Sequence, residues 1–155
     1  MLSYQSPGDH LLQKLKFNGR LEMARVLGEL MAHWLESVCE QLPDIVIPVP
    51  LHQDRLRERG FNQAIELALP IARHLGLPMD IRSCIRTKTT APQSDLSRKA
   101  RIKNVKDAFE VVRPVSGHVA IIDDVMTTGS TAHELARTLR QAGATRVEAW
   151  ICARA

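Results

Sequence analysis

The segment 119–131 carries the residues best suited to chemistry. It opens with an apolar run that reads as a buried strand and continues directly into two acids, Asp123 and Asp124. The next residues are rich in hydroxyls around a single glycine, Gly129, and a helical pattern begins at Thr131. We therefore predict a strand that delivers both acids to its carboxyl end, which is where ligands bind in open α/β sheets.

The start of the following helix is predicted to form an anion site. The first backbone N–H groups of a helix have no partner inside it, and together with the helix dipole they attract negative charge. Gly129 lets the backbone approach a phosphate closely. Hydroxyl donors surround it at Thr127, Thr128, Ser130 and Thr131. The acids could accept hydrogen bonds from ribose hydroxyls, or hold Mg²⁺ through its waters, so the segment suits a sugar phosphate.

A purely structural interpretation of these residues is also open. Asp123 and Asp124 could be a helix cap and a solvated acid, and residues 128–131 could be a plain turn. Either feature alone favours that interpretation. The ordered combination of strand, acid pair, hydroxyl-rich loop and helix start is more specific, and it favours a ligand site.

A second feature is the concentration of positive charge in residues 86–106. This segment holds seven basic groups and one acid, Asp95, which gives +6, whereas the whole chain carries +4. A local basic block suits a polyanionic partner, such as a polyphosphate or a nucleic acid strand. A solvated basic helix face explains the charge equally well. The basic residues are Arg86, Lys88, Arg98, Lys99, Arg101, Lys103 and Lys106.

Alternating strand and helix patterns surround these segments and would position them. Helices are predicted where apolar residues recur every three to four positions, and strands where short apolar runs are rich in β-branched residues. The predicted helices are 9–41, 61–75 with a kink near Pro70, 98–105 and 131–141; the predicted strands are 45–49, 79–85, 109–112, 119–122 and 147–152; the predicted loops are 50–60 and 87–97. This alternation implies a mainly parallel sheet with helices on both faces.

The length and composition of the chain are typical of a globular protein. Its 155 residues, 45% hydrophobic and 25% charged, suit a single globular domain over 1–155. No apolar run reaches the roughly 18 residues that a membrane helix needs, and residues 1–20 lack a secretory signal pattern. The three cysteines form no C-x-x-C pair, so we expect reduced thiols and a cytoplasmic protein.

These segments resemble a known family. Residues 119–131 resemble the phosphoribosyl pyrophosphate (PRPP) signature of type I phosphoribosyltransferases. Two further segments, 47–64 with its Arg-Gly-Phe-Asn-Gln-Ala run and 86–109, are similar to the ComF/GntX branch of that superfamily. The resemblance covers residues 10–153. It implies the type I phosphoribosyltransferase fold, an α/β fold whose mainly parallel sheet is flanked by helices, with an N-terminal helical hood region in 1–43.

The resemblance also implies roles for the matched positions. Asp123 and Asp124 would contact the ribose hydroxyls, with Mg²⁺ nearby as the metal held at these acids. The basic residues 86–101 would form a mobile hood over the pyrophosphate, in which Lys88 or Arg101 neutralises the charge that develops on this leaving group. The other implied substrate-binding residues are Pro50, Leu51, His52, Arg55 and Arg59 at the pyrophosphate, and Val125, Met126, Thr127, Thr128, Gly129, Ser130 and Thr131 at the ribose 5′-phosphate.

Ordinary structural roles remain open for three of these side chains. Arg55 and Arg59 could form salt bridges with Asp54 or Glu58, which lie one helical turn away or less. His52 could be an ordinary polar loop residue rather than an acid or base.

Two departures limit what the resemblance implies. Family members commonly carry a cysteine-rich, zinc-ribbon-like segment before the first helix, and residues 1–20 contain no cysteine, so we expect that module to be absent. Purine transferases of the hypoxanthine type place an aspartate where Thr127 stands, and a threonine cannot handle the proton of the base. The acceptor base therefore stays unassigned.

The implied function is PRPP-dependent transfer of a 5-phosphoribosyl group with release of pyrophosphate. A non-catalytic PRPP-binding regulator is one alternative, because a fold does not dictate function. An accessory protein of DNA uptake is another, because ComF relatives are associated with natural competence and the basic block could contact single-stranded DNA. The low aromatic content of 4% argues against that contact. The candidate partners are PRPP, single-stranded DNA and a second copy of the chain, with no membrane among them.

Overall fold

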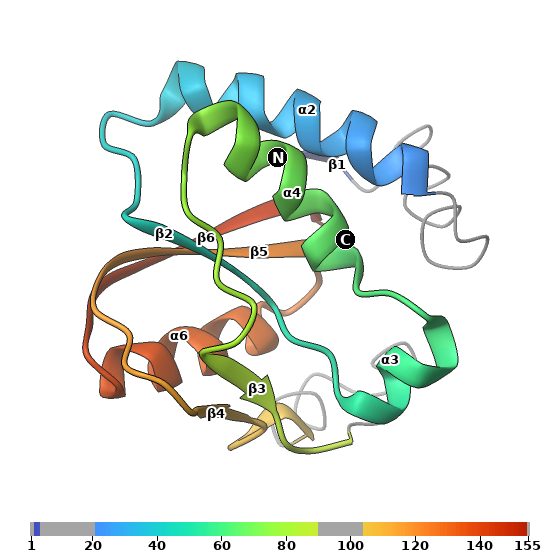
Figure 1. Cartoon of the computed structure of the whole chain (residues 1–155), viewed down its shortest axis with the longest axis vertical. Helices are drawn as coiled ribbons and strands as arrows, with labels where there is room; N and C mark the ends of the chain where they lie inside the picture. Colours follow the sequence, from blue (N-terminus) through green and yellow to red (C-terminus); the bar gives the residue numbers. More distant parts are fainter. Residues whose placement is uncertain (1, 4–20, 90–103, 155) are drawn as a thin grey trace.

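The computed structural model describes residues 2–3, 21–89 and 104–154 (Figure 1). Strands and helices alternate along these residues. The strands are β1 (Leu2–Ser3), β2 (Ile45–Pro48), β3 (Cys84–Arg86), β4 (Phe109–Val111), β5 (Gly117–Met126) and β6 (Ala144–Arg154). The helices are α2 (Leu21–Val38), α3 (Gln53–Arg59), α4 (Gln63–Leu75) and α6 (Ser130–Gln141).

A parallel sheet forms the centre of the molecule. Its strand order is β1-β6-β5-β2, and every neighbouring pair is parallel. Ile47 of β2 lies opposite Ile121 of β5, and Pro48 lies opposite Ile122. β3 and β4 form a separate antiparallel pair. Because all strands of the central sheet point the same way, their carboxyl ends share one edge, which is the right-hand end of β5 in Figure 1.

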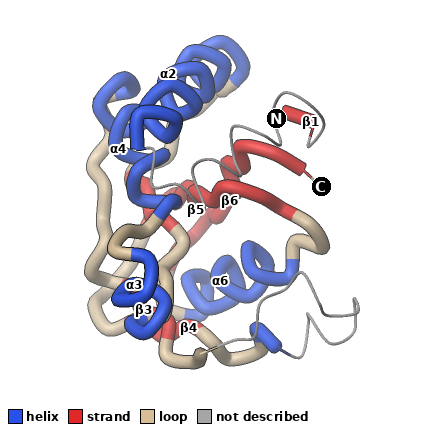
Figure 2. Tube along the Cα trace, turned by 90° about the vertical axis from the view of Figure 1, so that its right-hand side faces the viewer, coloured by secondary structure: helices blue, strands red, loops and turns tan. Residues whose placement is uncertain are grey.

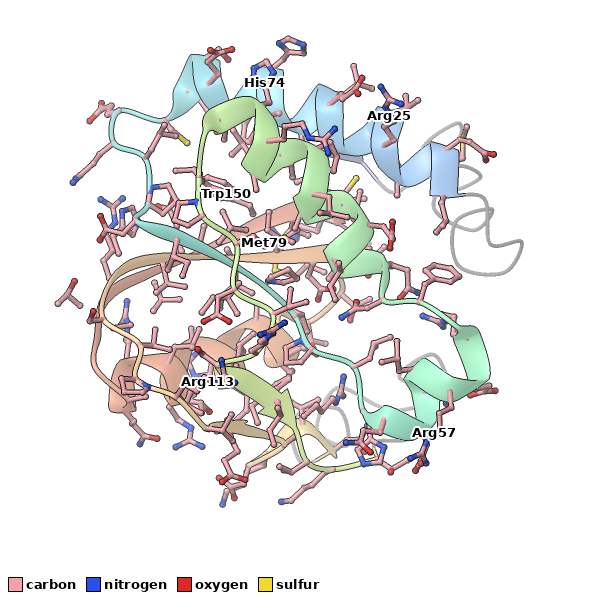
Figure 3. All side chains as sticks on the ribbon, viewed as in Figure 1. Arg25, Arg57, His74, Met79, Arg113 and Trp150 are labelled. Atoms are coloured by element: carbon pink, nitrogen blue, oxygen red, sulfur yellow. The ribbon has the colours of Figure 1, made fainter. Side chains whose placement is uncertain are left out.

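Helices cover both faces of this sheet, as the alternation of the sequence predicted. α2 and α4 lie together on one face and α6 lies on the other (Figure 2). Side chains alternate accordingly along β5, because successive strand residues point to opposite faces. Ala120 and Ile122 belong to the core under α2 and α4, whereas Val119 and Ile121 belong to the core under α6. Trp150 of β6 also lies beneath the α2–α4 layer (Figure 3).

The two helices of that layer approach each other closely. A side-chain carbon at Gly28 of α2 would collide with the ring of Pro70 and would lie 2.7 Å from the carbonyl oxygen of Leu67, both in α4. Glycine is therefore the residue that permits this packing. Pro70 stands inside α4, which continues beyond it to Leu75 as one helix.

The structure corrects several sequence-based boundaries. Residues 50–60 are not a loop throughout, because α3 occupies Gln53–Arg59. The strand predicted at 79–85 is Cys84–Arg86, preceded by a single parallel bridge between Met79 and Val46. β5 continues beyond the predicted end at Ile122 to Met126, so the acid pair belongs to the strand itself.

Other predictions fall partly outside the described residues. The helix predicted at 9–41 is observed as α2 from Leu21 to Val38, and residues 4–20 of the predicted N-terminal region lie outside the description. The predicted loop 87–97 is described only to Thr89. The predicted helix 98–105 is described only at Asn104 and Val105, which are helical. Among the described helices, none is both long and apolar enough to cross a membrane.

Candidate functional site

The acid pair lies near the carboxyl end of β5, with its two side chains on opposite faces. Asp123 follows Ile121 on the α6 face and lines a small hollow there. Asp124 follows Ile122 on the α4 face, is 9% exposed, and raises the pKa of the buried Cys152 thiol through its charge, after the larger effect of burial. Strand alternation therefore separates two carboxylates that the sequence placed side by side.

The hollow beside Asp123 is completed by the start of α6. Gly129 is the N-cap residue of α6, with φ 74° and ψ 2°. Because glycine has no side chain, it makes no capping hydrogen bond of its own. The left-handed backbone at this position favours glycine. Thr128 and Ser130 hydrogen-bond to each other through their hydroxyls at 2.7 Å, so both hydroxyls flank the turn. The hollow is lined by Asp123, Val125, Met126, Thr127, Gly129, Ser130, Thr131, Ala132 and Ile151.

The predicted pyrophosphate turn lies on the neighbouring strand at the same edge. The N–H of Val49 donates to the carbonyl oxygen of Ile122 at 2.9 Å, which extends the β2–β5 pairing by one residue. Pro50, Leu51 and His52 follow immediately and are half-buried. This register brings the turn beside the acid pair, as expected from the shared edge of a parallel sheet.

Asn62 holds this turn against the start of α4, a role that the sequence analysis did not assign. Its side-chain carbonyl accepts from the N–H of Ala64 at 3.0 Å and so caps the helix. Its amide group donates to the carbonyl oxygen of Val49 at 3.0 Å. The side chain is buried, with the residue 6% exposed. A single residue thus ties the amino end of α4 to the last residue before the turn.

His52 begins α3 and joins it to the segment that follows β3. It is the N-cap of α3, where its Nδ1 accepts from the N–H of Asp54 at 3.3 Å. The Thr89 hydroxyl lies 3.0 Å from the same Nδ1 and donates to the Asp54 carboxylate at 3.3 Å. Thr89, which belongs to the predicted hood 86–101, therefore contacts the residue that ends the predicted pyrophosphate turn.

Arg86 is a further basic residue near the acids, and its only predicted place in the site was as the first residue of the hood 86–101. Its guanidinium lies over the ring of Phe109, 5.5 Å from the centroid. Burial lowers the pKa of Arg86; the Asp123 charge opposes this effect and the Arg55 charge adds to it. The last residue of β3 thus carries a half-buried cation whose electrostatic neighbours include Asp123 and Arg55.

The other predicted basic residues have different surroundings. Arg55 donates to the Glu58 carboxylate at 2.9 Å, which is the salt bridge that the sequence left open. Arg59 is half-buried at the end of α3. Lys88 donates from Nζ to the carbonyl oxygen of Lys106 at 3.0 Å, which links the two described ends of the basic segment. Arg101 lies outside the described residues, so its predicted catalytic role stays a prediction.

A network on α6 anchors the end of the basic segment next to the site. Glu134, 7% exposed, accepts from the N–H of Asp107 at 2.8 Å and from the Arg137 guanidinium at 2.6 Å. Asp107 has a positive φ of 53°. The hydrogen bond from Arg137 lowers the pKa of Glu134, against the opposing effect of burial. The turn at Asp107 is therefore fixed to the helix whose first residues line the hollow.

The donor set at the hollow is compatible with Mg²⁺. The ion prefers oxygen ligands and is usually held by one or two carboxylates together with oxygens of a phosphate-bearing substrate. Asp123 offers a carboxylate to the hollow, whereas Asp124 is buried on the other face. Mg²⁺ would therefore be held at Asp123 together with ligand oxygens.

Solved structures of enzymes share this arrangement of strands and helices. The glutamine PRPP amidotransferase from B. subtilis, complexed with ADP and GMP, aligns with a TM-score of 0.55 and 25% identity over 83% of this chain and 26% of its own. A structure of the allosteric regulatory enzyme of purine biosynthesis aligns with a TM-score of 0.56 and 24% identity over 83% of this chain and 25% of its own. This chain therefore spans about a quarter of those proteins, and it has the type I phosphoribosyltransferase fold.

Sequence relatives then narrow the class to a family. DNA utilization protein YhgH of Shigella flexneri is 42% identical over 156 residues, which cover 97% of this chain and 69% of that protein. Competence protein F of Haemophilus influenzae is 35% identical over 160 residues, covering 98% of this chain and 70% of that protein. No family model matches the sequence. The chain belongs to the family of these DNA utilization and competence F proteins, as the ComF/GntX resemblance predicted.

Proposed function

We propose that this protein binds PRPP at the carboxyl edge of its sheet and transfers the 5-phosphoribosyl group to an acceptor, with release of pyrophosphate. One observation carries the proposal: Asp123 and the glycine-containing turn before α6 line the same hollow. A carboxylate beside the start of a helix, where the helix dipole attracts negative charge, suits a ligand that carries hydroxyls and a phosphate on one small ring.

Each group has a proposed task in this complex. The backbone N–H groups and hydroxyls of 127–131 donate to the 5′-phosphate, because they form the start of α6. Asp123, the acid of the pair that lines the hollow, accepts hydrogen bonds from the ribose hydroxyls. The turn 50–52 receives the pyrophosphate, and Arg86 supplies positive charge from the neighbouring β3. Bound Mg²⁺ supplies further neutralisation of the pyrophosphate charge.

The proposed reaction exchanges one bond at C1 of the ribose for another. The bond between C1 and the pyrophosphate oxygen breaks, and the pyrophosphate leaves with the electron pair. A nucleophilic atom of the acceptor forms the new bond to C1 and loses its proton. The protein contributes mainly by positioning and by stabilising charge on the leaving group, since neither task requires a covalent bond to the chain.

Titration calorimetry of PRPP with Mg²⁺ tests the binding step. Asp123→Asn keeps the shape of the side chain and removes its charge, and a hydrogen bond to a charged group contributes about 1.5–3 kcal/mol. We therefore expect the affinity to fall about tenfold or more. Asp124→Asn is the second variant, and the exposed Glu110→Gln on β4 is the matched control. Unchanged affinity in Asp123→Asn would contradict the assignment of this carboxylate.

Pyrophosphate release over a panel of nucleobases tests the catalytic step separately. Release that depends on one base identifies the acceptor class. PRPP binding without release under any base supports the non-catalytic regulator instead, on the same fold and the same hollow. Absence of PRPP binding would contradict both versions.

A second candidate function is single-stranded DNA binding by the basic segment 86–106. The names of the relatives, a DNA utilization protein and a competence protein, favour it. Each phosphate contact on a single strand should contribute about −0.7 to the slope of log affinity against log salt. A fluorescence titration of a labelled oligonucleotide at several salt concentrations measures this slope.

Two charge variants locate this binding on the described residues. Lys88→Gln and Lys106→Gln remove charge from the basic segment, and Arg113→Gln removes an exposed charge outside it. We expect the first two to weaken binding and to make the slope shallower, and PRPP to compete. Equal losses in all three variants, or no binding at low salt, would contradict a DNA role for this segment.

A further inference from the structure

A cluster of three side chains that can bind metal ions lies on α2 and α4, on the face of the sheet opposite to α6 and the hollow. His33 and Glu36 belong to α2, and His74 belongs to α4. One ligand atom from each of the three lies within 4.8 Å of the other two. The Oε2 atom of Glu36 is 2.9 Å from Nε2 of His74. The rings of His33 and His74 meet edge to face, with centroids 4.4 Å apart.

We propose that His33, Glu36 and His74 form a binding site for Zn²⁺ that joins α2 to α4. Two imidazoles and one carboxylate are a ligand set that zinc uses, with a water or another group in the fourth position. Imidazole nitrogens select zinc and its neighbours in the transition series, whereas Mg²⁺ selects oxygens. This proposal is independent of the PRPP function.

The distances suit a zinc ion after small side-chain rotations. Zinc bonds to nitrogen and oxygen ligands are about 2.0–2.2 Å long, so tetrahedral ligand atoms lie about 3.4 Å from one another. The Oε2 atom of Glu36 and Nε2 of His74 are 2.9 Å apart, and the ligand atoms of all three residues lie within 4.8 Å of one another. All three residues are exposed, so rotation of their side chains meets no core packing.

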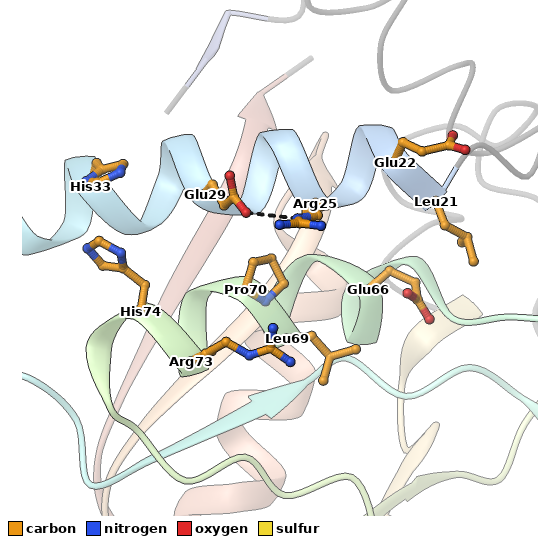
Figure 4. Close-up of a pocket in the computed structure, with 10 residues that line it drawn as sticks. All are labelled: Leu21, Glu22, Arg25, Glu29, His33, Glu66, Leu69, Pro70, Arg73 and His74. Atoms are coloured by element: carbon orange, nitrogen blue, oxygen red, sulfur yellow. Dashed lines mark hydrogen bonds and ion pairs between the residues drawn. The ribbon is translucent and has the colours of Figure 1, made fainter.

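The backbone that carries the ligands is held by close packing. α2 and α4 run in the same direction, from Leu21 to His33 in one helix and from Glu66 to His74 in the other (Figure 4). The contact of Gly28 with Pro70 fixes their separation. His74 follows Pro70 by one helical turn, and His33 follows Gly28 by little more than one turn. The histidines also line one end of a groove of about 520 Å³ between the two helices.

Charge at this position favours a cation. Glu36 and His74 lie in the last turns of α2 and α4. The carboxyl ends of helices carry partial negative charge and stabilise positive ions. Glu36 is an exposed carboxylate, a group that is ionised at neutral pH and can bind a cation. The ligand set thus includes one carboxylate and draws on the last turns of two helices.

The site lies at the edge of the sheet that the PRPP proposal does not use. α4 begins at Gln63, beside the carboxyl end of β2, and ends at Leu75. The chain then returns to Met79, which pairs with Val46 near the amino end of β2. The zinc ligands are therefore separated from the hollow by the length of α4, and their substitution leaves the PRPP-binding residues in place.

Competition between the metal-free chain, without a histidine tag, and a chromophoric zinc chelator tests the proposal. We expect one Zn²⁺ per chain with micromolar or tighter affinity. His33→Ala and His74→Ala should each weaken this affinity by about tenfold or more, since the loss of supporting residues alone costs that much at zinc sites. His133→Ala is the matched control, because His133 is exposed on α6 and outside the cluster.

Circular dichroism and melting temperatures distinguish the loss of a zinc ligand from the loss of the fold. Circular dichroism of each variant establishes that it is folded, and His33→Ala leaves the pair of Glu36 and His74 intact if His74→Ala is unstable. Zn²⁺ should raise the melting temperature of the parent chain and of His133→Ala, but not of His33→Ala. Millimolar affinity in the parent, or equal zinc affinity in His33→Ala and His133→Ala, would show that these residues form only a surface hydrogen bond and a ring contact.

Discussion

Replacement of Asn62 by alanine should destabilise the protein more than the removal of one small polar side chain would suggest. The change removes the cap of α4, which contributes about 1 kcal/mol in typical helices. It also removes the donor to the buried Val49 carbonyl, and an unsatisfied buried group costs about 1–3 kcal/mol. The two losses together predict a decrease of about 2–4 kcal/mol in the free energy of unfolding. For a chain of this size, that corresponds to a melting temperature lower by roughly 5–15 °C.

A second variant separates the two contributions. Asn62→Ser retains an oxygen that can cap α4 but is too short to reach Val49, so it should recover about 1 kcal/mol relative to Asn62→Ala. Urea unfolding followed by circular dichroism measures both values. Exposed Gln53→Ala at the start of α3 is the control, since it removes a polar amide without burial. An Asn62→Ala midpoint within error of the parent would refute the claim that this side chain holds the turn and the helix together.

Two further predictions concern titratable groups. The folded-state pKa of Glu134 is lowered by Arg137, so its contribution to stability is complete above the ordinary glutamate pKa and is lost as pH falls through the lower folded value. Glu134→Gln should therefore be less stable than the parent at pH 7, with a difference that shrinks in acid; a constant difference in urea midpoints would contradict this. Burial raises the pKa of Cys84 to about 12 and that of Cys152 to about 11. A thiol reagent at neutral pH should therefore label the half-exposed Cys39 first. Mass spectrometry of the labelled peptides measures the order, and earlier labelling of Cys84 or Cys152 would contradict the prediction.

The parallel sheet and its two helical layers were predictable from the sequence, because they rest on long apolar patterns. α3 was missed because it has no buried residue, so no apolar periodicity marks it. It is defined instead by its ends, where His52 caps the start and Gly60 adopts φ 82° at the finish. The end of β5 was also misplaced, because aspartates are rare in strands and the pairing of Val125 with Ala153 extends the strand past them.

The candidate site was predictable where its residues are close in sequence and hidden where they are not. The acid pair and the turn before α6 form one continuous segment, so their proximity could be predicted. The link from Asn62 to Val49 spans a helix and a turn, and the proximity of Arg86 to Asp123 depends on the packing of β3. The cluster of His33, Glu36 and His74 joins two helices, so no local sequence pattern predicts it.

The pairing of Ile47 with Ile121 has a consequence for how this protein can change over evolutionary time. From that pair, each strand continues without a loop toward the carboxyl edge of the sheet, where the candidate site lies. No loop in this stretch could therefore accommodate an extra residue. One insertion in β5 between Ile121 and Asp123 would send every later side chain to the opposite face and exchange the surroundings of the two acids. Insertions after Val111, in the turn before β5, change no such alternation. Length variation among descendants of this chain should therefore collect in that turn, and the strand segments should keep a constant number of residues.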